Sequence, residues 1–302
     1  MHASLYFTIG KFFCQVLFYK FTVFLHFSPA IFVLVQIWHL QDVITIDFFL
    51  SLCYNFDSKL RRFGVEGGSC MSRDFFSREI ALIGEESFEK LHSSRVILFG
   101  IGGVGGYILE ALVRAGVGYI TVVDNDVVSE SNINRQILAT SENIGEKKTA
   151  AAVRRAKQIN PDINIDAIDL FYLPETADKI DLSGYNYIID AIDTVSAKIE
   201  LAARAGALGI PFISCMGTAN KVDTSGFRVC DIYKTSGCPL ARVMRTECRK
   251  RNIPSFPVVF SDSPSLPCSL EENGRRIPAS ISFVPPIAAF VTVGEVVREL
   301  TK

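Results

Sequence analysis

The amino-acid sequence predicts an α/β fold built on a mostly parallel β-sheet. Between residues 95 and 216, short apolar runs alternate with longer segments of helical periodicity, as in parallel strands joined by right-handed helical crossovers. The first apolar run leads directly into the glycine cluster GIGGVGG at 100–106, which opens a helix-forming segment. After Gly217 the pattern changes to short pieces that favour antiparallel strands. The sequence therefore predicts a Rossmann-like fold with an antiparallel C-terminal extension.

The predicted elements follow one another in a regular order. Between residues 71 and 94, apolar side chains recur at helical spacing and indicate an amphipathic helical region. The predicted strands are 95–99, 119–124, 164–168, 187–191 and 211–216, and the predicted helices between them are 104–114, 147–158 and 195–208. In the extension we expect antiparallel strands at 227–233 and 256–261, a basic helix at 239–251 and an apolar helix at 286–300.

Length and composition exclude several classes of protein. The chain has 302 residues and a formal net charge of −1, so its bulk charge indicates neither a nucleic acid nor a membrane surface as a partner. Its 8 cysteines include no C-x-x-C pair, and no export signal precedes the glycine cluster. These features favour a reduced, cytoplasmic compartment without a disulfide framework.

Residues 1–70 differ from the rest of the chain because they are crowded with Phe, Ile, Val and Leu. Residues 21–41 carry no charge and have roughly the length of a membrane span, but their polar side chains weaken that interpretation. A signal peptide is poorly supported because no positive region precedes a small-residue cleavage site. A third hypothesis is that the segment is not translated and that synthesis begins at Met71, since Glu66-Gly67-Gly68 can be encoded by a purine-rich ribosome-binding tract. We therefore predict a single domain over 71–302.

The glycine cluster is the first candidate ligand site. Gly100, Gly102 and Gly105 have G-x-G-x-x-G spacing, with Gly103 between them, at a junction where backbone N–H groups and the helix dipole favour an anion. The motif alone is weak, because a tight turn with close helix packing also needs glycines. Asp124 ends the next predicted strand, where an acid commonly binds ribose hydroxyls. These features leave open whether the ligand is a redox dinucleotide or ATP.

The segment after Asp124 favours ATP. Asn132, Arg135 and Gln136 lie in one polar segment, which is more than a nicotinamide cofactor requires. The planar guanidinium of an arginine suits phosphate oxygens and can stabilise the charge on a departing pyrophosphate.

Two further residues fit the same chemistry. Lys148 opens a predicted helix and offers a point charge to an α-phosphate, although a surface lysine is the simpler interpretation of either Lys147 or Lys148. Asp193 follows the strand 187–191, where its carboxylate could hold the Mg²⁺ that accompanies ATP or could simply cap a helix.

These motifs together resemble a known family. The combination of GIGGVGG, VVDNDVVSESNINRQ, IGEKK and DAID is similar to the ThiF/MoeB/HesA superfamily of adenylating enzymes, over about residues 75 to 220. The resemblance implies a homodimer that uses ATP to adenylate a substrate carboxylate. It assigns Asp124 to the ribose, Asn132, Arg135 and Gln136 to the phosphates, Lys148 to the α-phosphate, Asp193 to magnesium and Arg78 to the ATP site of the partner subunit.

Two branches of the superfamily compete. One branch activates the C-terminal glycine of a ubiquitin-like sulfur carrier and usually binds zinc through two C-x-x-C pairs, which this chain lacks, so we expect no zinc. The stretch from Cys215 to Arg251 instead resembles the tRNA threonylcarbamoyladenosine dehydratase branch, with its G-x-A-N-K-x-D loop, DIYKT and a PLA helix. That resemblance implies ATP-dependent cyclisation of N6-threonylcarbamoyladenosine at position 37 of tRNA. An NAD-dependent oxidoreductase and a membrane-anchored binding protein are less favoured alternatives.

A local basic cluster agrees with a tRNA substrate. Phosphate contacts depend on local positive charge rather than on net charge, although a solvated helix face explains the same pattern. The candidate tRNA-binding residues are Lys234, Arg242, Arg245, Arg249, Lys250 and Arg251.

The remaining expectations concern two cysteines, a cation and a protein partner. Cys215 and Cys238 are tempting nucleophiles, but cyclisation needs no enzyme thiol, and a cysteine in FISCM fits a core position. By resemblance, a monovalent cation near Gly217 and a cysteine desulfurase or sulfur acceptor as partner are further expectations.

Overall fold

The computed structural model describes residues 73–268, 271–272 and 275–302. The predictions for residues 1–70 and for a start at Met71 lie outside this part of the chain. Within it, no helix combines the length and the apolar composition that crossing a membrane requires.

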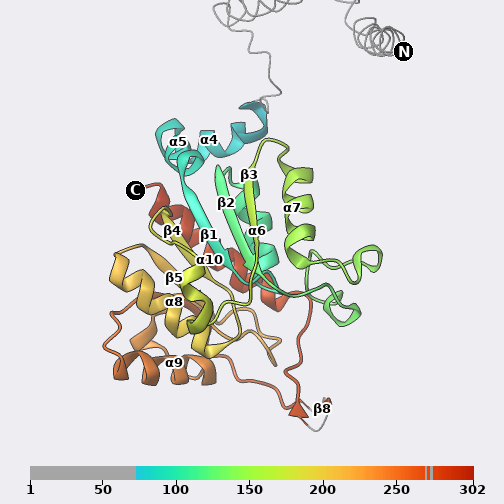
Figure 1. The fold of residues 1–302 in the computed structure, drawn as a ribbon, viewed down its shortest axis with the longest axis vertical. Helices are drawn as coiled ribbons and strands as arrows, with labels where there is room; N and C mark the ends of the chain where they lie inside the picture. Colours follow the sequence, from blue (N-terminus) through green and yellow to red (C-terminus); the bar gives the residue numbers. More distant parts are fainter. Residues whose placement is uncertain (1–72, 269–270, 273–274) are drawn as a thin grey trace, which may run out of the picture. The chain divides into compact units, whose positions relative to one another are not determined.

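A seven-stranded sheet forms the centre of the described residues, with the strand order β3-β2-β1-β4-β5-β7-β6 (Figure 1). All neighbouring pairs are parallel except β6 and β7. The strands are β1 (Arg95–Phe99), β2 (Tyr119–Asp124), β3 (Asn164–Asp169), β4 (Tyr187–Asp190), β5 (Phe212–Cys215), β6 (Phe227–Asp231) and β7 (Pro257–Ser261). The predicted α/β class and mostly parallel sheet are confirmed.

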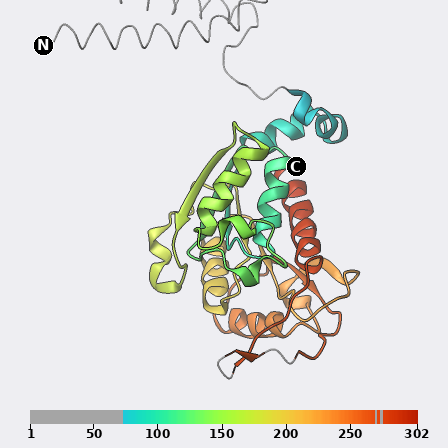
Figure 2. The same ribbon diagram turned by 90° about the vertical axis from the view of Figure 1, so that its right-hand side faces the viewer.

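Helices cover both faces of the sheet. The helices are α4 (Ser77–Ile83), α5 (Glu85–Ser93), α6 (Gly105–Arg114), α7 (Lys148–Ile159), α8 (Val195–Leu208), α9 (Pro239–Lys250) and α10 (Val284–Leu300). One hydrophobic core lies between the sheet and α6, α7 and α10, and a second lies between the sheet and α8 and α9. Figure 2 shows α10, in red, beside α6, in blue-green, and the rings of Phe290 and Tyr107 meet between them at 6.3 Å.

The C-terminal extension continues the main sheet rather than forming a separate layer. β7 pairs in parallel with β5, with Ser214 opposite Val258, and β6 then adds to β7 as the antiparallel edge strand. The extension is thus antiparallel as predicted, but only through β6 and a small hairpin of β8 (Glu271–Glu272) and β9 (Arg275–Arg276) that the sequence did not indicate.

Helix starts differ from the predictions by one or two residues for local reasons. α7 begins at Lys148 because Lys147 is extended and bridges to Val127. α10 begins at Val284, ahead of the predicted 286, because prolines suit the first turn of a helix, where no N–H partner is needed.

The N-terminal helical region is broken into two helices at Gly84, whose φ of 85° favours glycine. Its first helix, α4, carries Glu79, and burial raises the pKa of this carboxyl to about 7. Because the folded-state pKa lies above the ordinary value, Glu79 contributes stability only while it is protonated. That contribution is complete below pH 4.5 and is lost as the pH rises through about 7.

We therefore expect Glu79→Gln to flatten the decline of the melting temperature with rising pH over this range. Thermal unfolding of both proteins across the range measures the difference. An unchanged pH profile in the variant would show that Glu79 is not the group responsible.

Candidate functional site

The predicted site residues gather at the edge of the sheet where the parallel strands end. β1 lies between β2 and β4, so the strand order reverses between β1 and β4. In open α/β sheets ligands bind outside the carboxyl ends of the strands at such a switch point. The glycine loop, residues 100–104, follows β1 at this point, and β2 and β4 end beside it.

Neighbouring strands hold the glycine loop on two sides. The Ile101 N–H donates to Oδ2 of Asp124 over 2.7 Å. On the other side, a Cβ at Gly100 would lie 2.8 Å from the carbonyl oxygen of Ala191. Gly100 also has a φ of 83°, so both its conformation and its surroundings require glycine.

Gly105, the first residue of α6, makes the closest contact with the glycine loop. A Cβ at this position would lie 1.8 Å from the Gly100 carbonyl oxygen, which is a severe overlap. We expect Gly105→Ala to destabilise the fold by about 1–3 kcal/mol and to abolish nucleotide binding. Urea unfolding and calorimetric titration with AMP measure the two effects.

Gly184→Ala is the matched control, because no atom lies within 4 Å of the Cβ position at Gly184. It should unfold and bind as the unchanged protein does. Equal AMP affinity in the two variants would refute the steric argument.

Asp124 accepts backbone hydrogen bonds in addition to its predicted contact with the ribose. Its Oδ1 accepts the Asp126 N–H at 2.8 Å, while its Oδ2 accepts the Ile101 N–H. A carboxylate has about four lone-pair sites. Asp124 can therefore shape the glycine loop and still accept ribose hydroxyls.

The polar segment after β2 packs against the same loop. If Gly102 carried a Cβ, that atom would lie 3.8 Å from Nε2 of Gln136. A Cβ at Gly103 would lie 3.6 Å from the carbonyl oxygen of Arg135. Gln136 is buried, with 7% of its surface exposed. Gln136 thus lies beside the glycine loop.

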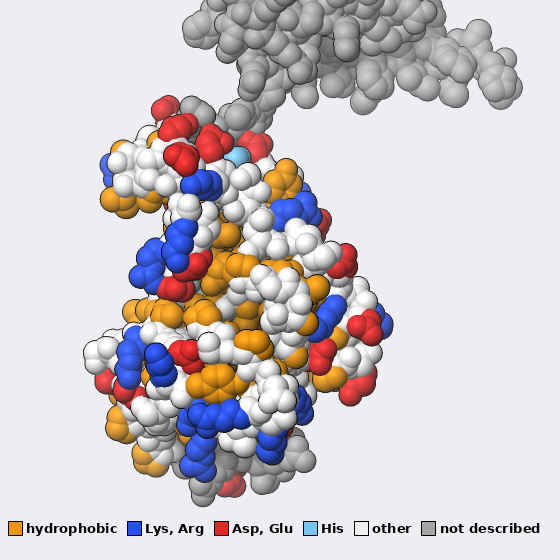
Figure 3. Space-filling view, turned by 90° about the vertical axis from the view of Figure 1, so that its left-hand side faces the viewer, with side chains coloured by type: hydrophobic (Ala, Val, Ile, Leu, Met, Phe, Trp, Pro, Cys, Tyr) orange, Lys and Arg blue, Asp and Glu red, His pale blue; other side chains and the backbone are white. Residues whose placement is uncertain are grey.

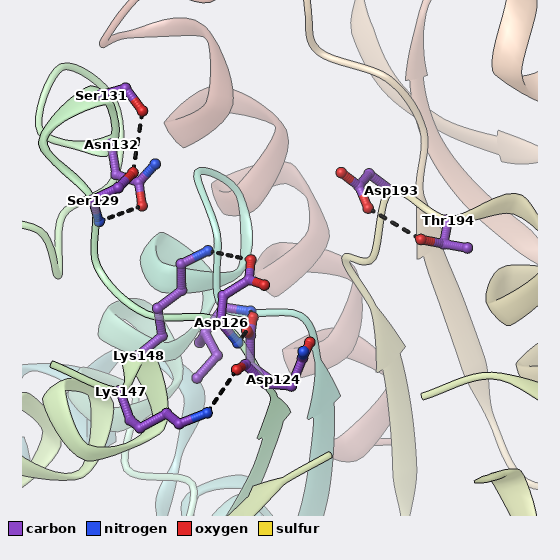
Figure 4. Close-up of polar contacts among 11 residues, drawn as sticks. Asp124, Asp126, Ser129, Ser131, Asn132, Lys147, Lys148, Asp193 and Thr194 are labelled. Atoms are coloured by element: carbon purple, nitrogen blue, oxygen red, sulfur yellow. Dashed lines mark hydrogen bonds and ion pairs between the residues drawn. The ribbon is translucent and has the colours of Figure 1, made fainter. Parts of the chain in front are cut away.

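The side chains of Arg135 and Asn132 also form hydrogen bonds within their own segment. Nη1 of Arg135 donates to the Ser131 carbonyl at 2.7 Å and to Oδ1 of Asn134 at 2.9 Å. Oδ1 of Asn132 accepts the Ser129 N–H at 3.2 Å and closes a short 3-10 turn (Figure 4). Asn132 therefore shapes the segment, a role that its sequence position did not indicate, while both side chains retain donors for phosphate.

Lys148 and Asp126 form an ion pair beside Asp124. Nζ of Lys148 donates to Oδ2 of Asp126 at 2.8 Å, and Figure 4 shows the two side chains pointing toward each other. The Lys148 side chain is 7% exposed, whereas that of Asp126 is 61% exposed. Lys147 instead pairs with Asp169 on the surface. Of the two lysines, Lys148 is the buried one at the site.

Asp193 lies at the same edge but apart from Lys148 (Figure 4). It is exposed, and its Oδ1 accepts the Thr194 hydroxyl at 3.4 Å. Among the described residues, no group of three or more His, Cys, Asp or Glu side chains is arranged to hold a metal ion.

Residues 76–302 match the sequence pattern of the ThiF family. The chain belongs to the ThiF family. This identification covers the whole sheet and agrees with the placement of the glycine loop, Asp124, Gln136 and Lys148 at one edge.

Relatives within the ThiF family point to one branch. The tRNA threonylcarbamoyladenosine dehydratase of Bacillus subtilis is 39% identical over 242 residues, which cover 75% of this chain and 94% of the relative. The sulfur carrier protein adenylyltransferase of Thermus thermophilus is 35% identical over 142 residues, 46% of this chain and 52% of the relative. The first match extends across both halves of the chain.

Solved structures agree with this result. The E. coli tRNA N6-threonylcarbamoyladenosine dehydratase TcdA in complex with AMP superposes with a TM-score of 0.71 and 30% identity, covering 77% of this chain and 96% of that protein. The same enzyme in complex with ATP gives a TM-score of 0.69.

Arg78 lies outside the site of its own chain. It is exposed on α4, which Figure 1 places at the amino end of the strands, opposite the glycine loop. In this ThiF protein a role for Arg78 thus requires a second subunit, and that role stays a prediction.

The basic residues of α9 are only partly free to bind phosphate. Glu247 pairs with Lys250 and Arg251, Arg245 donates to the Thr235 hydroxyl, and Arg249 lies over the Tyr233 ring. Arg242 and Lys234 are exposed and make no ion pair with the described residues. Figure 3 shows Lys and Arg side chains, in blue, gathered in the lower part of one face.

The two candidate thiols are core residues. Cys215 and Cys238 are each 4% exposed. Burial raises the pKa of the Cys215 thiol to about 11, and its Sγ lies 3.1 Å from the Thr292 hydroxyl. Because the thiolate is the nucleophile, this environment disfavours a catalytic role for Cys215 in the ThiF site.

One buried ion pair was not predicted from the sequence. Lys198 and Asp190 are both 0% exposed and lie 2.9 Å apart at the carboxyl end of β4. The signals were an acid ending the otherwise apolar strand YIID and a lysine on the apolar face of the helix at Leu201 and Ala202.

Proposed function

We propose that this chain dehydrates N6-threonylcarbamoyladenosine at position 37 of tRNA in an ATP-dependent reaction. The observation that carries this proposal is the meeting of the glycine loop, Asp124 and Lys148 at one edge of the sheet. The match to the Bacillus subtilis dehydratase over 94% of its length supports the choice of branch.

The reaction has two steps. A threonyl carboxylate oxygen attacks the α-phosphorus of ATP, a P–O bond forms and pyrophosphate leaves. The urea nitrogen of the same modification then attacks the activated carbonyl carbon, loses its proton to solvent and expels AMP with the carboxylate oxygen. No enzyme thiol is needed, in agreement with the burial of Cys215.

Each site residue has one task in this proposal. Backbone N–H groups of the glycine loop bind phosphate oxygens and Asp124 binds the ribose. Lys148 and Arg135 stabilise charge on the α-phosphate and on the departing pyrophosphate, while Gln136 and Asn132 orient the phosphates.

Asp193 would hold Mg²⁺. Mg²⁺ usually takes one or two carboxylates together with phosphate oxygens and water, and it would neutralise phosphate charge. An exposed carboxylate whose only hydrogen bond to the described residues is a 3.4 Å contact fits that role.

The proposed enzyme is a homodimer in which Arg78 enters the site of the partner subunit. Large apolar side chains are exposed on and near α4 and α10, among them Leu82 at 84%, Phe290 at 51% and Phe283 at 46%. These exposed apolar side chains are available for a contact between subunits. Sedimentation analysis tests the dimer, and a sulfur-transfer partner stays a prediction.

The test incubates the full chain with ATP and tRNA that carries the uncyclised modification. We expect AMP and pyrophosphate, and a nucleoside lighter by one water after digestion and mass spectrometry. A small carrier protein ending in Gly-Gly is the competing substrate. Transfer of AMP to that carrier, with the tRNA unchanged, would favour the adenylyltransferase branch instead.

Arg242 tests the proposed tRNA contact on α9. Each lost phosphate contact reduces the salt dependence of binding by roughly one unit of slope and weakens binding of every tRNA sequence. We expect Arg242→Ala to weaken tRNA binding several-fold and to lower the slope in this way. Filter binding at several salt concentrations measures both.

Arg298→Ala is the control, since Arg298 lies on the last turn of α10 and pairs with Glu295. It should leave tRNA binding unchanged. Equal effects of the two variants would remove the support for α9 as the tRNA surface.

A further inference from the structure

A closed polar network lies beneath the candidate site. The ammonium group of Lys198 donates to Oδ2 of Asp190 at 2.9 Å, to the Ser214 hydroxyl at 3.1 Å and to the carbonyl oxygen of Cys215 at 2.7 Å. The Ser214 hydroxyl in turn donates to Oδ2 of Asp190 at 2.5 Å. All three donors of the ammonium are therefore used, and Lys198, Asp190 and Ser214 are each 0% exposed.

The second carboxylate oxygen of Asp190 shapes the turn that follows β4. Oδ1 accepts the Ile192 N–H at 3.0 Å, while Oδ2 is held by Lys198 and Ser214. A carboxylate anchored through one oxygen can offer the other in only one direction. A chain of hydrogen bonds therefore joins Lys198 through Asp190 to the turn at 191–193, the segment that carries Asp193.

The turn at 191–193 packs against one side of the glycine loop. The Ala191 N–H donates to the Phe99 carbonyl at 2.8 Å. The Ala191 carbonyl oxygen would lie 2.8 Å from a Cβ at Gly100, and the Ala191 Cβ would lie 3.5 Å from a Cβ at Gly105. Ala191 therefore packs so closely against the glycine loop that only glycine fits at Gly100.

We propose that Lys198 is a positioning residue for the nucleotide: through Asp190 it fixes the turn at 191–193, and that turn fixes the phosphate-binding glycine loop. The effect does not depend on metal, because it acts on the backbone that receives the phosphates. This proposal rests on one part of the proposed function, namely that the glycine loop binds an adenine nucleotide.

A buried lysine can also be merely structural, so the test needs readouts that loss of stability alone does not change. The first is exchange of the Ile192 amide hydrogen, which reports directly on the bond to Asp190. The second is the affinity for AMP alone, measured by calorimetry on the full chain without Mg²⁺ or tRNA.

Three variants separate positioning from stability. Lys198→Met leaves Asp190 without its cation. Lys198→Arg keeps the charge and donors. The double variant D190N/K198M removes both charges together, so no unpaired charge stays buried and the protein can fold. Glu110→Gln is the control, because it weakens a buried charge pair elsewhere in the fold, the contacts of Glu110 on α6 to Arg114 and to Arg155 of α7.

We expect faster exchange of the Ile192 amide and an AMP affinity lower by about tenfold in Lys198→Met and in the double variant, the size of effect that loss of one hydrogen bond to a charged group produces. Lys198→Arg should recover most of the affinity, and Glu110→Gln should retain it.

Wild-type AMP affinity in a folded double variant, or an unchanged Ile192 amide in Lys198→Met, would overturn the proposal. The two proposals fail separately. If the unchanged protein does not bind AMP, the proposed function is wrong, whereas the Ile192 exchange rates still decide whether Lys198 fixes the turn.

Discussion

Lys148→Met is expected to lower the rate of adenylate formation by about 10²–10³-fold, the loss typical of removing one charge-stabilising donor from a preorganised site. The Lys148 ammonium is buried, with 7% of its side chain exposed, and it faces the carboxylate of Asp126. In this protein the α-phosphate would take the place of that carboxylate, and methionine cannot stabilise its charge. Exchange of labelled pyrophosphate into ATP measures the step.

Lys147→Met is the matched control, because the neighbouring lysine pairs with Asp169 at the surface. A surface ion pair of this kind contributes about 0–1 kcal/mol, so the rate should hardly change. Asp126→Asn gives a second comparison, since it removes the group that competes with phosphate for Lys148 and should not reduce ATP affinity. Equal losses in Lys147→Met and Lys148→Met would mean that the buried lysine has no special role.

The sequence predicted β1, β2, β4 and β5 well because each is a short, largely apolar run bounded by polar or glycine residues, whereas β3 has the more polar sequence NIDAID. β1 and β2 have the predicted bounds, and β3, β2, β1, β4 and β5 pair in parallel, as the predicted helical crossovers require. The insertion of β7 between β5 and β6 could not be predicted in the same way. A local pattern identifies a strand but does not say which edge it will join.

The candidate site was only partly predictable for a related reason. Motif spacing and the family resemblance identified the glycine loop, Asp124 and Lys148 as candidates, which the structure places at the ends of β1 and β2 and at the start of α7. The difference in burial between Lys147 and Lys148 became visible only in the structure, because spacing does not give burial. Asp190 and Lys198 were missed because each is a single charge on an apolar element, and their meeting depends on how α8 packs on β4.

The second large expected effect is a loss of folding stability when the Asp190–Lys198 pair is broken. Taking two charges out of water is costly, and their attraction with good hydrogen bonds about offsets that cost. Here the ammonium has three acceptors and the carboxylate three donors. Lys198→Met should therefore destabilise the fold by about 3–5 kcal/mol, because Asp190 is left as an uncompensated buried charge.

The double variant D190N/K198M should cost much less than Lys198→Met alone, although it removes more of the network. Such a reversal is expected only if the single variant suffers from an unpaired charge rather than from lost packing, because packing losses would add. Urea unfolding of the wild type, both single variants and the double variant gives the coupling free energy directly. Additive losses across these four proteins would mean that water or an ion reaches Asp190 when Lys198 is absent, and that the pair is not sealed as its 0% exposure implies.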